Sequence, residues 1–127
     1  MYNKLCKVIV LYKVYFLRLK MELENKIYIG KLIDRYGPLL TDKQLSSVEN
    51  YYLFDISLSE IAQNNQISRQ AAYDLVTKSK NLLISYEQKL NVNATLTSAI
   101  NDLLRIVELE KDDQLKNKLH EVINKLR

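Results

Sequence analysis

The stretch from Ser57 to Leu90, SLSEIAQNNQISRQAAYDLVTKSKNLLISYEQKL, decides the fold that we expect for this chain. Its first part shows the apolar spacing of one face of a short helix, at Leu58, Ile61 and Ala62. A polar turn follows over residues 64–66, and Ser68 is a residue type that commonly caps the start of a second helix. Two helices joined by a tight turn in this way are typical of a helix-turn-helix.

Two helix starts are predicted independently by capping boxes, in which a Ser or Thr is followed three residues later by Glu or Gln. Ser57 and Glu60 form one such pair at the start of the helix-turn-helix. Thr41 and Gln44 form another, one helix earlier. We therefore expect helices to begin directly after Thr41 and directly after Ser57.

The helix predicted after Ser68 carries one long stripe whose members step by four and three residues. We expect this stripe to pack against a partner for about five turns, through Ala72, Val76, Ser79, Leu83, Tyr86 and Leu90. The outward side then carries Arg69, Gln70, Tyr73, Thr77 and Lys78.

An outward face of this kind at the start of a second helix is the surface that enters the major groove of DNA. Arg pairs with guanine and Gln with adenine, so Arg69 and Gln70 are the candidates for base contacts. The candidate nucleic-acid-binding residues are Ser68, Arg69, Gln70, Tyr73, Thr77, Lys78 and Lys80. The alternative is that Arg69 and Lys78 are ordinary solvated charges and that Tyr73 packs against a neighbouring helix.

The charge of the chain is unevenly distributed. Its 127 residues are enough for one domain, and the formal net charge is +4. Residues 1–20 contain five basic residues and no acidic one, which leaves 14 basic and 15 acidic residues for the rest. The body is therefore close to neutral, which counts against strong DNA binding by a monomer, because non-specific affinity comes from neutralised phosphates.

Residues 1–20 are unlike the rest, being apolar, β-branched, aromatic and basic. Lys7 and Lys13 interrupt the apolar run, so neither a secretory signal nor a membrane span fits, and we expect no membrane insertion. One remaining interpretation is an arm that binds a membrane surface or a polyanion. The other, which we expect, is an over-extended gene start with translation beginning at Met21. If translated, Val8–Phe16 is predicted to be a β-prone segment that promotes aggregation.

Helical periodicity with only two glycines and one proline predicts an all-α helical bundle. One helix is expected over residues 22–36, ended by Gly37-Pro38, and the next from Thr41 to Leu53 or Phe54. Three parts are expected: the basic apolar extension 1–20, a helix-turn-helix domain 21–92, and a C-terminal helical hairpin 93–127.

The C-terminal hairpin is predicted from two apolar stripes separated by polar breaks at 91–94 and 110–113. The stripes are Leu96, Ile100, Leu103 and Val107, then Leu115, Leu119, Val122, Ile123 and Leu126. Such a hairpin either completes the core of its own chain or packs against a second copy. We expect a homodimer, because doubled helix-turn-helix proteins bind two half-sites of one operator.

Several classes of chemistry are disfavoured by what the sequence contains. Cys6 is the only cysteine and His120 the only histidine, which leaves no disulfide, no zinc finger and no thiol-imidazole catalytic pair. No Gly-rich phosphate loop and no supported pair of carboxylates is present. We therefore expect no enzyme, no cofactor and no metal, in a protein of the reducing cytoplasm.

Four segments carry a resemblance to a known family: Leu40–Gln44 (LTDKQ), Asp55–Ala62 (DISLSEIA), Ile67–Asp74 (ISRQAAYD) and Leu82–Leu90 (LLISYEQKL). Together they resemble the YlxM/p13-like family of bacterial helix-turn-helix regulators, over roughly residues 22–110. The resemblance agrees with Met21 as the start of translation.

That family is similar to the promoter-recognition region 4 of sigma factors, and its gene typically lies beside those of the signal recognition particle GTPase or its receptor. The resemblance therefore implies a cytosolic, non-enzymatic protein that acts in or regulates the signal recognition particle pathway. By the family pattern, the start of the recognition helix is occupied by Ser68, Arg69, Gln70, Tyr73 and Asp74.

The sequence departs from the pattern at Gln66, where helix-turn-helix turns often have Gly or Asn, and over residues 77–80, which are less basic than in many members. A second hypothesis is therefore an interaction module that contacts a protein or RNA component of the pathway. The two hypotheses differ in the expected placement of cations. The cations concerned are Lys43, Arg69, Lys78 and Lys80. If they share one face, DNA binding is favoured, and if they are scattered, the interaction module is favoured.

Overall fold

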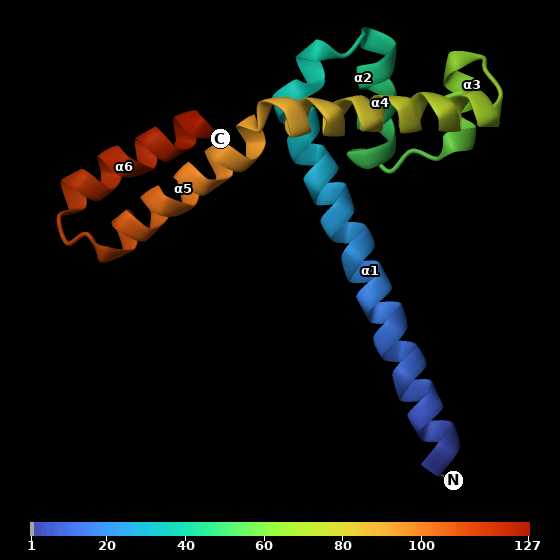
Figure 1. Cartoon of the computed structure of the whole chain (residues 1–127), viewed down its shortest axis with the longest axis horizontal. Coiled ribbons are helices and arrows are strands. Elements are labelled where there is room, and N and C mark those ends of the chain that lie inside the picture. The colour runs from blue at the N-terminus through green and yellow to red at the C-terminus, as the bar shows by residue number, and fades with distance from the viewer. Residues whose placement is uncertain (1) are drawn as a thin grey trace. The chain divides into compact units, whose positions relative to one another are not determined.

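The computed structural model describes residues 2–127, with side chains from Lys4 onwards, so Met1 of the predicted extension lies outside it. The described residues form α1 (Tyr2–Tyr36), η1 (Gly37–Leu39), α2 (Asp42–Tyr52), α3 (Leu58–Asn65), α4 (Arg69–Leu90), α5 (Val92–Leu109) and α6 (Asp113–Leu126) (Figure 1). The predicted all-α class is confirmed, since no strand occurs in this part of the chain. Two compact units are formed, by residues 1–84 and 85–127.

The first helix, α1, begins much earlier than the predicted residue 22. It runs unbroken from Tyr2 and ends at Tyr36, where the predicted stop at Gly37-Pro38 is confirmed. The ion pairs Arg18–Glu22 and Lys20–Glu24 join side chains four residues apart across Met21. Residues 2–20 are thus a continuation of the same helix, and the predicted β-prone character of Val8–Phe16 is wrong in this structure.

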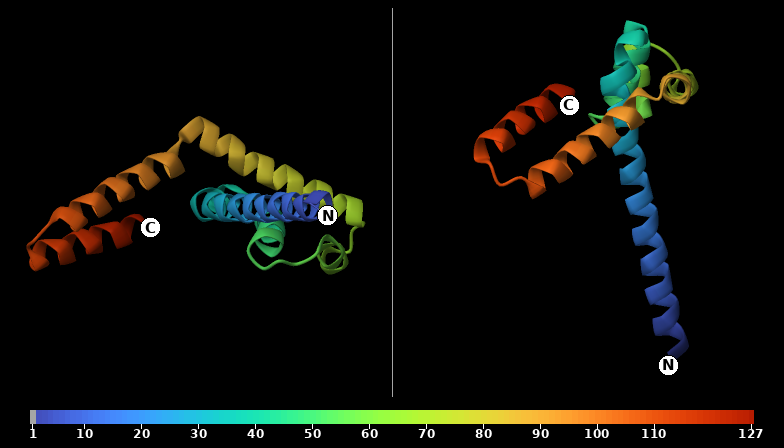
Figure 2. Two further views of the ribbon diagram at one scale, coloured as in Figure 1. Left: turned by 90° about the horizontal axis from the view of Figure 1, so that it is seen from below. Right: turned by 60° about the vertical axis from the view of Figure 1, so that its left-hand side comes forward.

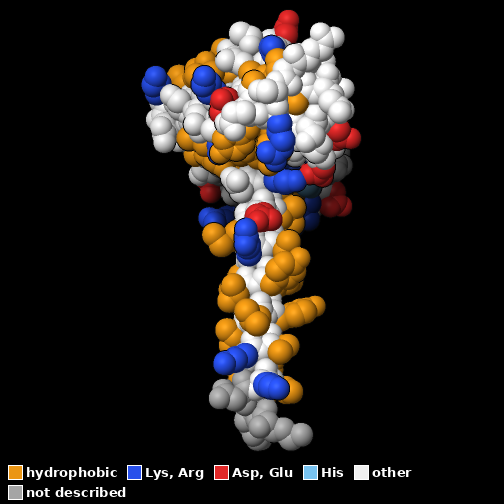
Figure 3. Space-filling model, turned by 90° about the vertical axis from the view of Figure 1, so that its right-hand side faces the viewer, with side chains coloured by type: hydrophobic (Ala, Val, Ile, Leu, Met, Phe, Trp, Pro, Cys, Tyr) orange, Lys and Arg blue, Asp and Glu red, His pale blue; other side chains and the backbone are white. Residues whose placement is uncertain are grey.

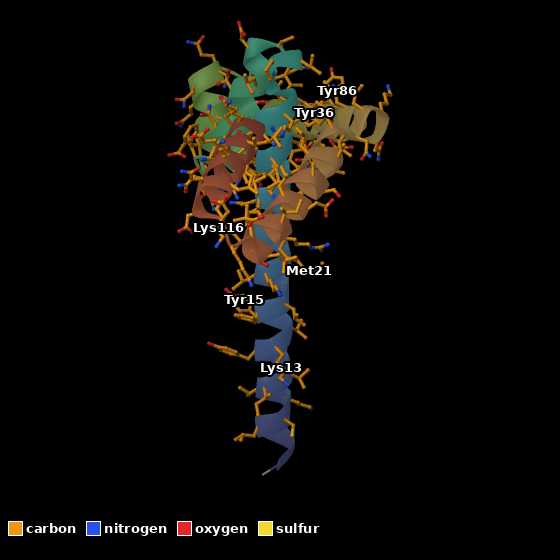
Figure 4. The ribbon with its side chains drawn as sticks, turned by 90° about the vertical axis from the view of Figure 1, so that its left-hand side faces the viewer. Lys13, Tyr15, Met21, Tyr36, Tyr86 and Lys116 are labelled. Carbon is orange, nitrogen blue, oxygen red and sulfur yellow. The ribbon has the colours of Figure 1, made fainter. Side chains whose placement is uncertain are left out.

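The N-terminal half of α1 contributes no buried core. Its large apolar side chains between Leu5 and Leu23 are 46–74% exposed. They cover the long helix in Figure 3, and Lys13 and Tyr15 project from it in Figure 4. No helix in the described part of the chain combines the length and the apolar character needed to cross a membrane.

The core of the first unit is built from the C-terminal half of α1, where Ile29, Leu32 and Ile33 are buried. This half packs against η1 and α2. Gly37 lies at a close approach, because a Cβ added there would meet Cδ1 of Leu45 at 3.0 Å. Lys26 of α1 also pairs with Asp55 in the loop after α2, and this hydrogen bond raises the pKa of Lys26.

Both predicted capping boxes are present. The Thr41 hydroxyl accepts a hydrogen bond from the Gln44 amide at 3.3 Å, and the Gln44 side chain accepts one from the Thr41 amide at 3.0 Å. Ser57 and Glu60 make the same reciprocal pair at 3.2 and 3.1 Å. These four bonds satisfy backbone donors that helix starts would otherwise leave unpaired, which fixes where α2 and α3 begin.

The second unit contains the predicted helical hairpin, in which α5 and α6 lie side by side (Figures 1 and 2). The predicted break at 110–113 is confirmed, and Asp112 caps α6 by accepting from the Gln114 amide at 2.9 Å. The other break is shorter than predicted, because only Asn91, with φ 53°, separates α4 from α5. Val107 of α5 and Ile123 of α6 are buried.

A buried carboxylate holds the start of α5. Glu87 is only 8% exposed and accepts hydrogen bonds from the amides of Asn93 at 3.1 Å and Ala94 at 2.9 Å. A negative charge at a helix N-terminus is favourable because the free amides there carry partial positive charge. Glu87 therefore acts as the cap that the helix lacks at Asn91, whose own side chain makes no capping bond.

Candidate nucleic-acid interface

The two helices of the predicted helix-turn-helix share a small apolar core. Ile61, Ala62, Ala72 and Val76 form a buried cluster, with Ala72 fully buried and Ala62 5% exposed. The two small residues of this cluster are Ala62 of α3 and Ala72 of α4. The core is completed by the partly buried Tyr51, Tyr52, Ile56, Leu58 and Ile67.

The turn between α3 and α4 is a Schellman motif built on a non-glycine residue. Gln66 has φ 54° and ψ 42°, the left-handed conformation. Its amide bonds to the Gln63 carbonyl at 3.2 Å, and the Ile67 amide bonds to the Ala62 carbonyl at 3.0 Å. This 6→1 and 5→2 pairing, with Ile67 packed on the apolar cluster, ends α3 sharply. Gln66 therefore adopts the conformation in which helix-turn-helix turns favour Gly, at a cost in backbone strain.

The start of α4 is capped as the sequence predicts. The Ser68 hydroxyl accepts a hydrogen bond from the Ala71 amide at 3.0 Å, and its carbonyl accepts from the Ala72 amide at 3.0 Å. Arg69 is the first residue of the helix and is exposed. The capped turn therefore holds the beginning of α4 at a fixed place on the surface.

The predicted stripe of α4 is buried over only part of its length. Ala72, Val76, Ser79 and Leu83 are buried, as expected. Tyr86 is only partly buried, and Leu90 is 55% exposed, so the expectation of five packed turns is wrong for the last of them.

The predicted site residues lie around the remaining surface of α4. Ser68, Arg69, Gln70, Tyr73 and Lys78 are exposed, whereas Thr77 and Lys80 are partly buried. At 3.6 residues per turn, Gln70 and Asp74 lie near the middle of the outward face, opposite the buried stripe. One flank carries Thr77, Tyr73, Lys80 and Arg69, and Lys78 lies on the opposite flank.

In the middle of this face, a hydrogen bond from Gln70 to Asp74 positions the Gln70 side chain. The Gln70 amide nitrogen donates to the Asp74 carboxylate at 3.1 Å, across one helical turn. Gln–Asp pairs at this spacing stabilise helices by a few tenths of a kcal/mol, about 0.2–0.5. The second N–H of Gln70 and its carbonyl remain available for a bidentate contact.

The flank that carries Tyr73 adjoins the apolar cluster. Tyr51 and Tyr52 meet edge to face with ring centroids 5.0 Å apart. Burial, followed by the neighbouring Tyr51 and Tyr73, raises the pKa of Tyr52. Tyr52 therefore keeps its proton at neutral pH and adds no negative charge to this flank, while Tyr73 remains 51% exposed.

The structure also brings Lys43 beside α4. A groove of about 360 Å³, the Lys43–Lys78 groove, is lined by Lys43, Ile67, Ala71, Asp74, Leu75 and Lys78. The four cations are thus neither all on one flank of α4 nor scattered, since Lys43 and Lys78 share one flank and Arg69 and Lys80 lie on the other.

The Gln70–Asp74 pair was detectable in the sequence from its spacing of four residues. The sharing of a groove by Lys43 and Lys78, 35 residues apart, required the fold.

Comparison with known proteins agrees with this arrangement. The model of the family described as "Putative helix-turn-helix protein, YlxM / p13 like" matches residues 23–126. A UPF0122 protein of Malacoplasma penetrans is 44% identical over 99 residues, covering 71% of this chain and 92% of the relative. A UPF0122 protein of Clostridium perfringens strain SM101 is 41% identical over 115 residues, covering 80% and 99%. One from Lactococcus lactis strain MG1363 is 39% identical over 103 residues, covering 80% and 93%.

The match includes both helices of the helix-turn-helix, the turn at Gln66 and the whole C-terminal hairpin. Four-fifths of the chain is aligned with relatives at about the same level of identity. The chain therefore belongs to the YlxM/p13-like helix-turn-helix family, also called UPF0122.

Proposed function

We propose that this protein is a non-enzymatic DNA-binding regulator that places the N-terminal half of α4 in the major groove. The observation that carries the proposal is the exposure of Arg69 and Gln70 at a capped helix start, held by a buried helix-turn-helix core. The N-terminal residues of a recognition helix are those that contact base edges.

The side chains divide into two roles. Arg69 and Gln70 contact bases, since a guanidinium pairs with guanine and a carboxamide with adenine. The Asp74 carboxylate holds the Gln70 amide in place for its contact. Phosphate contacts, which set the register without carrying sequence information, come from Ser68, Tyr73, Thr77, Lys78 and Lys80.

We further propose that the protein acts as a homodimer through its C-terminal hairpin. Ile106, Leu109, Leu115 and Val122 are 41–83% exposed on α5 and α6, which leaves apolar surface for a second copy to cover. A dimer presents two recognition helices to half-sites about 34 Å apart and doubles the number of phosphate contacts. Light scattering at micromolar concentration is expected to give the mass of two chains, and the mass of one chain would contradict the dimer.

A second candidate function is an interaction module for a protein or RNA component of the signal recognition particle pathway. The carboxylate of Asp74 in the middle of the exposed face favours it, since a negative charge there weakens attraction to DNA. The near-neutral charge of residues 21–127 favours it as well. In that case α4 would bind a protein surface, because the major groove of an RNA helix is too deep and narrow for it.

Arg69→Ala tests the DNA-binding proposal. We expect the variant to lose about 1–3 kcal/mol of binding free energy on the preferred DNA site and to tolerate any base at one position. The measurement is a titration of site variants with single base changes, by fluorescence anisotropy. Arg105→Ala is the matched control, since Arg105 is an exposed arginine of α5 whose only described ion pair is with Asp102. Equal affinity and equal selectivity of Arg69→Ala and the unchanged protein would refute the assignment.

A further inference from the structure

The Lys43–Lys78 groove brings together two positive charges from separate helices. Lys43 lies in the first turn of α2, outside the helix-turn-helix, and Lys78 lies in the third turn of α4. Both side chains are exposed at the groove. The groove is otherwise lined by the apolar Ile67, Ala71 and Leu75 and by the carboxylate of Asp74, so the two ammonium groups are the only cations that line it.

Neither lysine is neutralised within the protein. Among the described side chains, no carboxylate lies within ion-pair distance of Lys43 or Lys78. Asp74 is one turn before Lys78 and lines the same groove, but its carboxylate accepts a hydrogen bond from Gln70. Asp42 precedes Lys43 directly, and adjacent residues of a helix do not face each other. The two cations are therefore available to an anion from outside.

The nature of that anion follows from where the groove lies. Asp74 is exposed and would repel an anion placed beside its carboxylate, so the favourable position is the part of the rim between the two ammonium groups. The rim lies along the flank of α4 opposite Arg69, Tyr73 and Lys80. A helix in a major groove about 12 Å wide has the backbone of one strand along each flank. A phosphate of one strand would therefore lie at this rim.

We propose that Lys43 and Lys78 together bind the phosphate backbone of one DNA strand, while Lys80 on the other flank approaches the opposite strand. This inference rests on the proposed DNA-binding function and adds a residue, Lys43, that lies outside the helix-turn-helix. By this proposal, the phosphate contact made by Lys43 of α2 fixes how deep and at what angle α4 enters the major groove. Phosphate contacts of this type fix register and orientation.

The test uses the full chain and a DNA duplex selected from a random pool by the unchanged protein. Binding constants of Lys43→Gln, Lys78→Gln and the double variant are measured on the selected duplex and on an unrelated one. The salt concentration is varied from about 0.05 to about 0.3 M, which defines the slope of log K against log salt. Lys111→Gln is the control, because Lys111 is an exposed lysine between α5 and α6. Circular dichroism confirms that each variant is folded.

We expect each single variant to bind about five- to tenfold more weakly near 0.1 M salt, by a similar factor on both duplexes. The slope of log K against log salt is expected to decrease by about 1 for each lysine and by about 2 for the double variant. Lys111→Gln is expected to behave like the unchanged protein.

Two different failures are distinguishable. If the unchanged protein binds DNA selectively and Lys43→Gln has the same salt slope, the phosphate site is refuted and the DNA-binding function stands. A change of base preference at an unchanged slope would equally refute the phosphate role, since it would make Lys43 a base contact. If the unchanged protein selects no duplex from the random pool, the proposed function fails and the inference fails with it.

Discussion

Ile61→Ala is expected to lower the free energy of unfolding by about 2–5 kcal/mol. Ile61 is fully buried between α3 and α4, where it contacts the cluster that contains Ala62, Ala72 and Val76. Removing three carbons from it leaves a cavity that these small neighbours cannot fill. Native domains are stable by only about 5–15 kcal/mol, so this one change removes a large part of the stability of the helix-turn-helix.

Urea unfolding followed by circular dichroism measures this loss. Ile9→Ala is the matched control, because Ile9 is 50% exposed on the N-terminal half of α1 and its truncation leaves no enclosed cavity. The control is expected to change the free energy of unfolding by less than about 1 kcal/mol. If Ile61→Ala were no more destabilising than this control, the packing of α3 on α4 described above would be wrong.

Glu87→Ala is expected to destabilise the second unit by about 2–4 kcal/mol. The buried Glu87 carboxylate accepts two backbone hydrogen bonds at the start of α5. Bonds to a charged acceptor are stronger than neutral ones, and their loss leaves the amides of Asn93 and Ala94 without this partner. The favourable interaction of a negative charge with the helix N-terminus is lost as well.

Glu87→Gln separates the contribution of the hydrogen bonds to the stability from that of the negative charge. The carboxamide keeps an acceptor oxygen but no charge, so its loss of stability is expected to lie between that of Glu87→Ala and zero. Hydrogen exchange is the sharpest measurement, with protection at Asn93 and Ala94 falling in the order unchanged protein, Glu87→Gln, Glu87→Ala. Equal protection in all three proteins would show that Glu87 does not cap α5.

The features that sequence predicted well are those that depend on residues close together in the chain. The two capping boxes and the Ser68 cap are local hydrogen-bonding arrangements, so Thr41 and Ser57 predicted helix starts to the residue. The end of α1 at Gly37-Pro38 is equally local, because the proline ring sterically disfavours the α-helical conformation of the residue before it. The start of α4 was predictable for this reason.

The start of α1 was not predictable from composition. Residues 1–20 differ from the rest in charge and contain many β-branched side chains, but β-propensity expresses the context of a sheet surface rather than a backbone preference. Without a Gly or Pro between Tyr2 and Ile29, nothing ends the helix, and the pairs Arg18–Glu22 and Lys20–Glu24 connect its two halves.

The features of the candidate site likewise fall into those that the local sequence predicted and those that depend on tertiary packing. Periodicity was sufficient to place Gln70 and Lys78 on the outward side of α4. It could not show that Gln66 would adopt a left-handed conformation, which depends on the packing of Ile67 against Ala62. Nor could it show that Lys43 reaches the flank of α4, since that requires the packing of the helices in the first unit.

The proposed recognition of DNA by α4 is tested by fluorescence anisotropy of the full chain and of Arg69→Ala with fragmented DNA of its own genome, at two salt concentrations. We expect selective binding to a subset of fragments, weakened by salt and lost in the variant. Equal weak binding to every fragment, or no binding at either salt concentration, would contradict the proposal and favour a protein partner for the same surface.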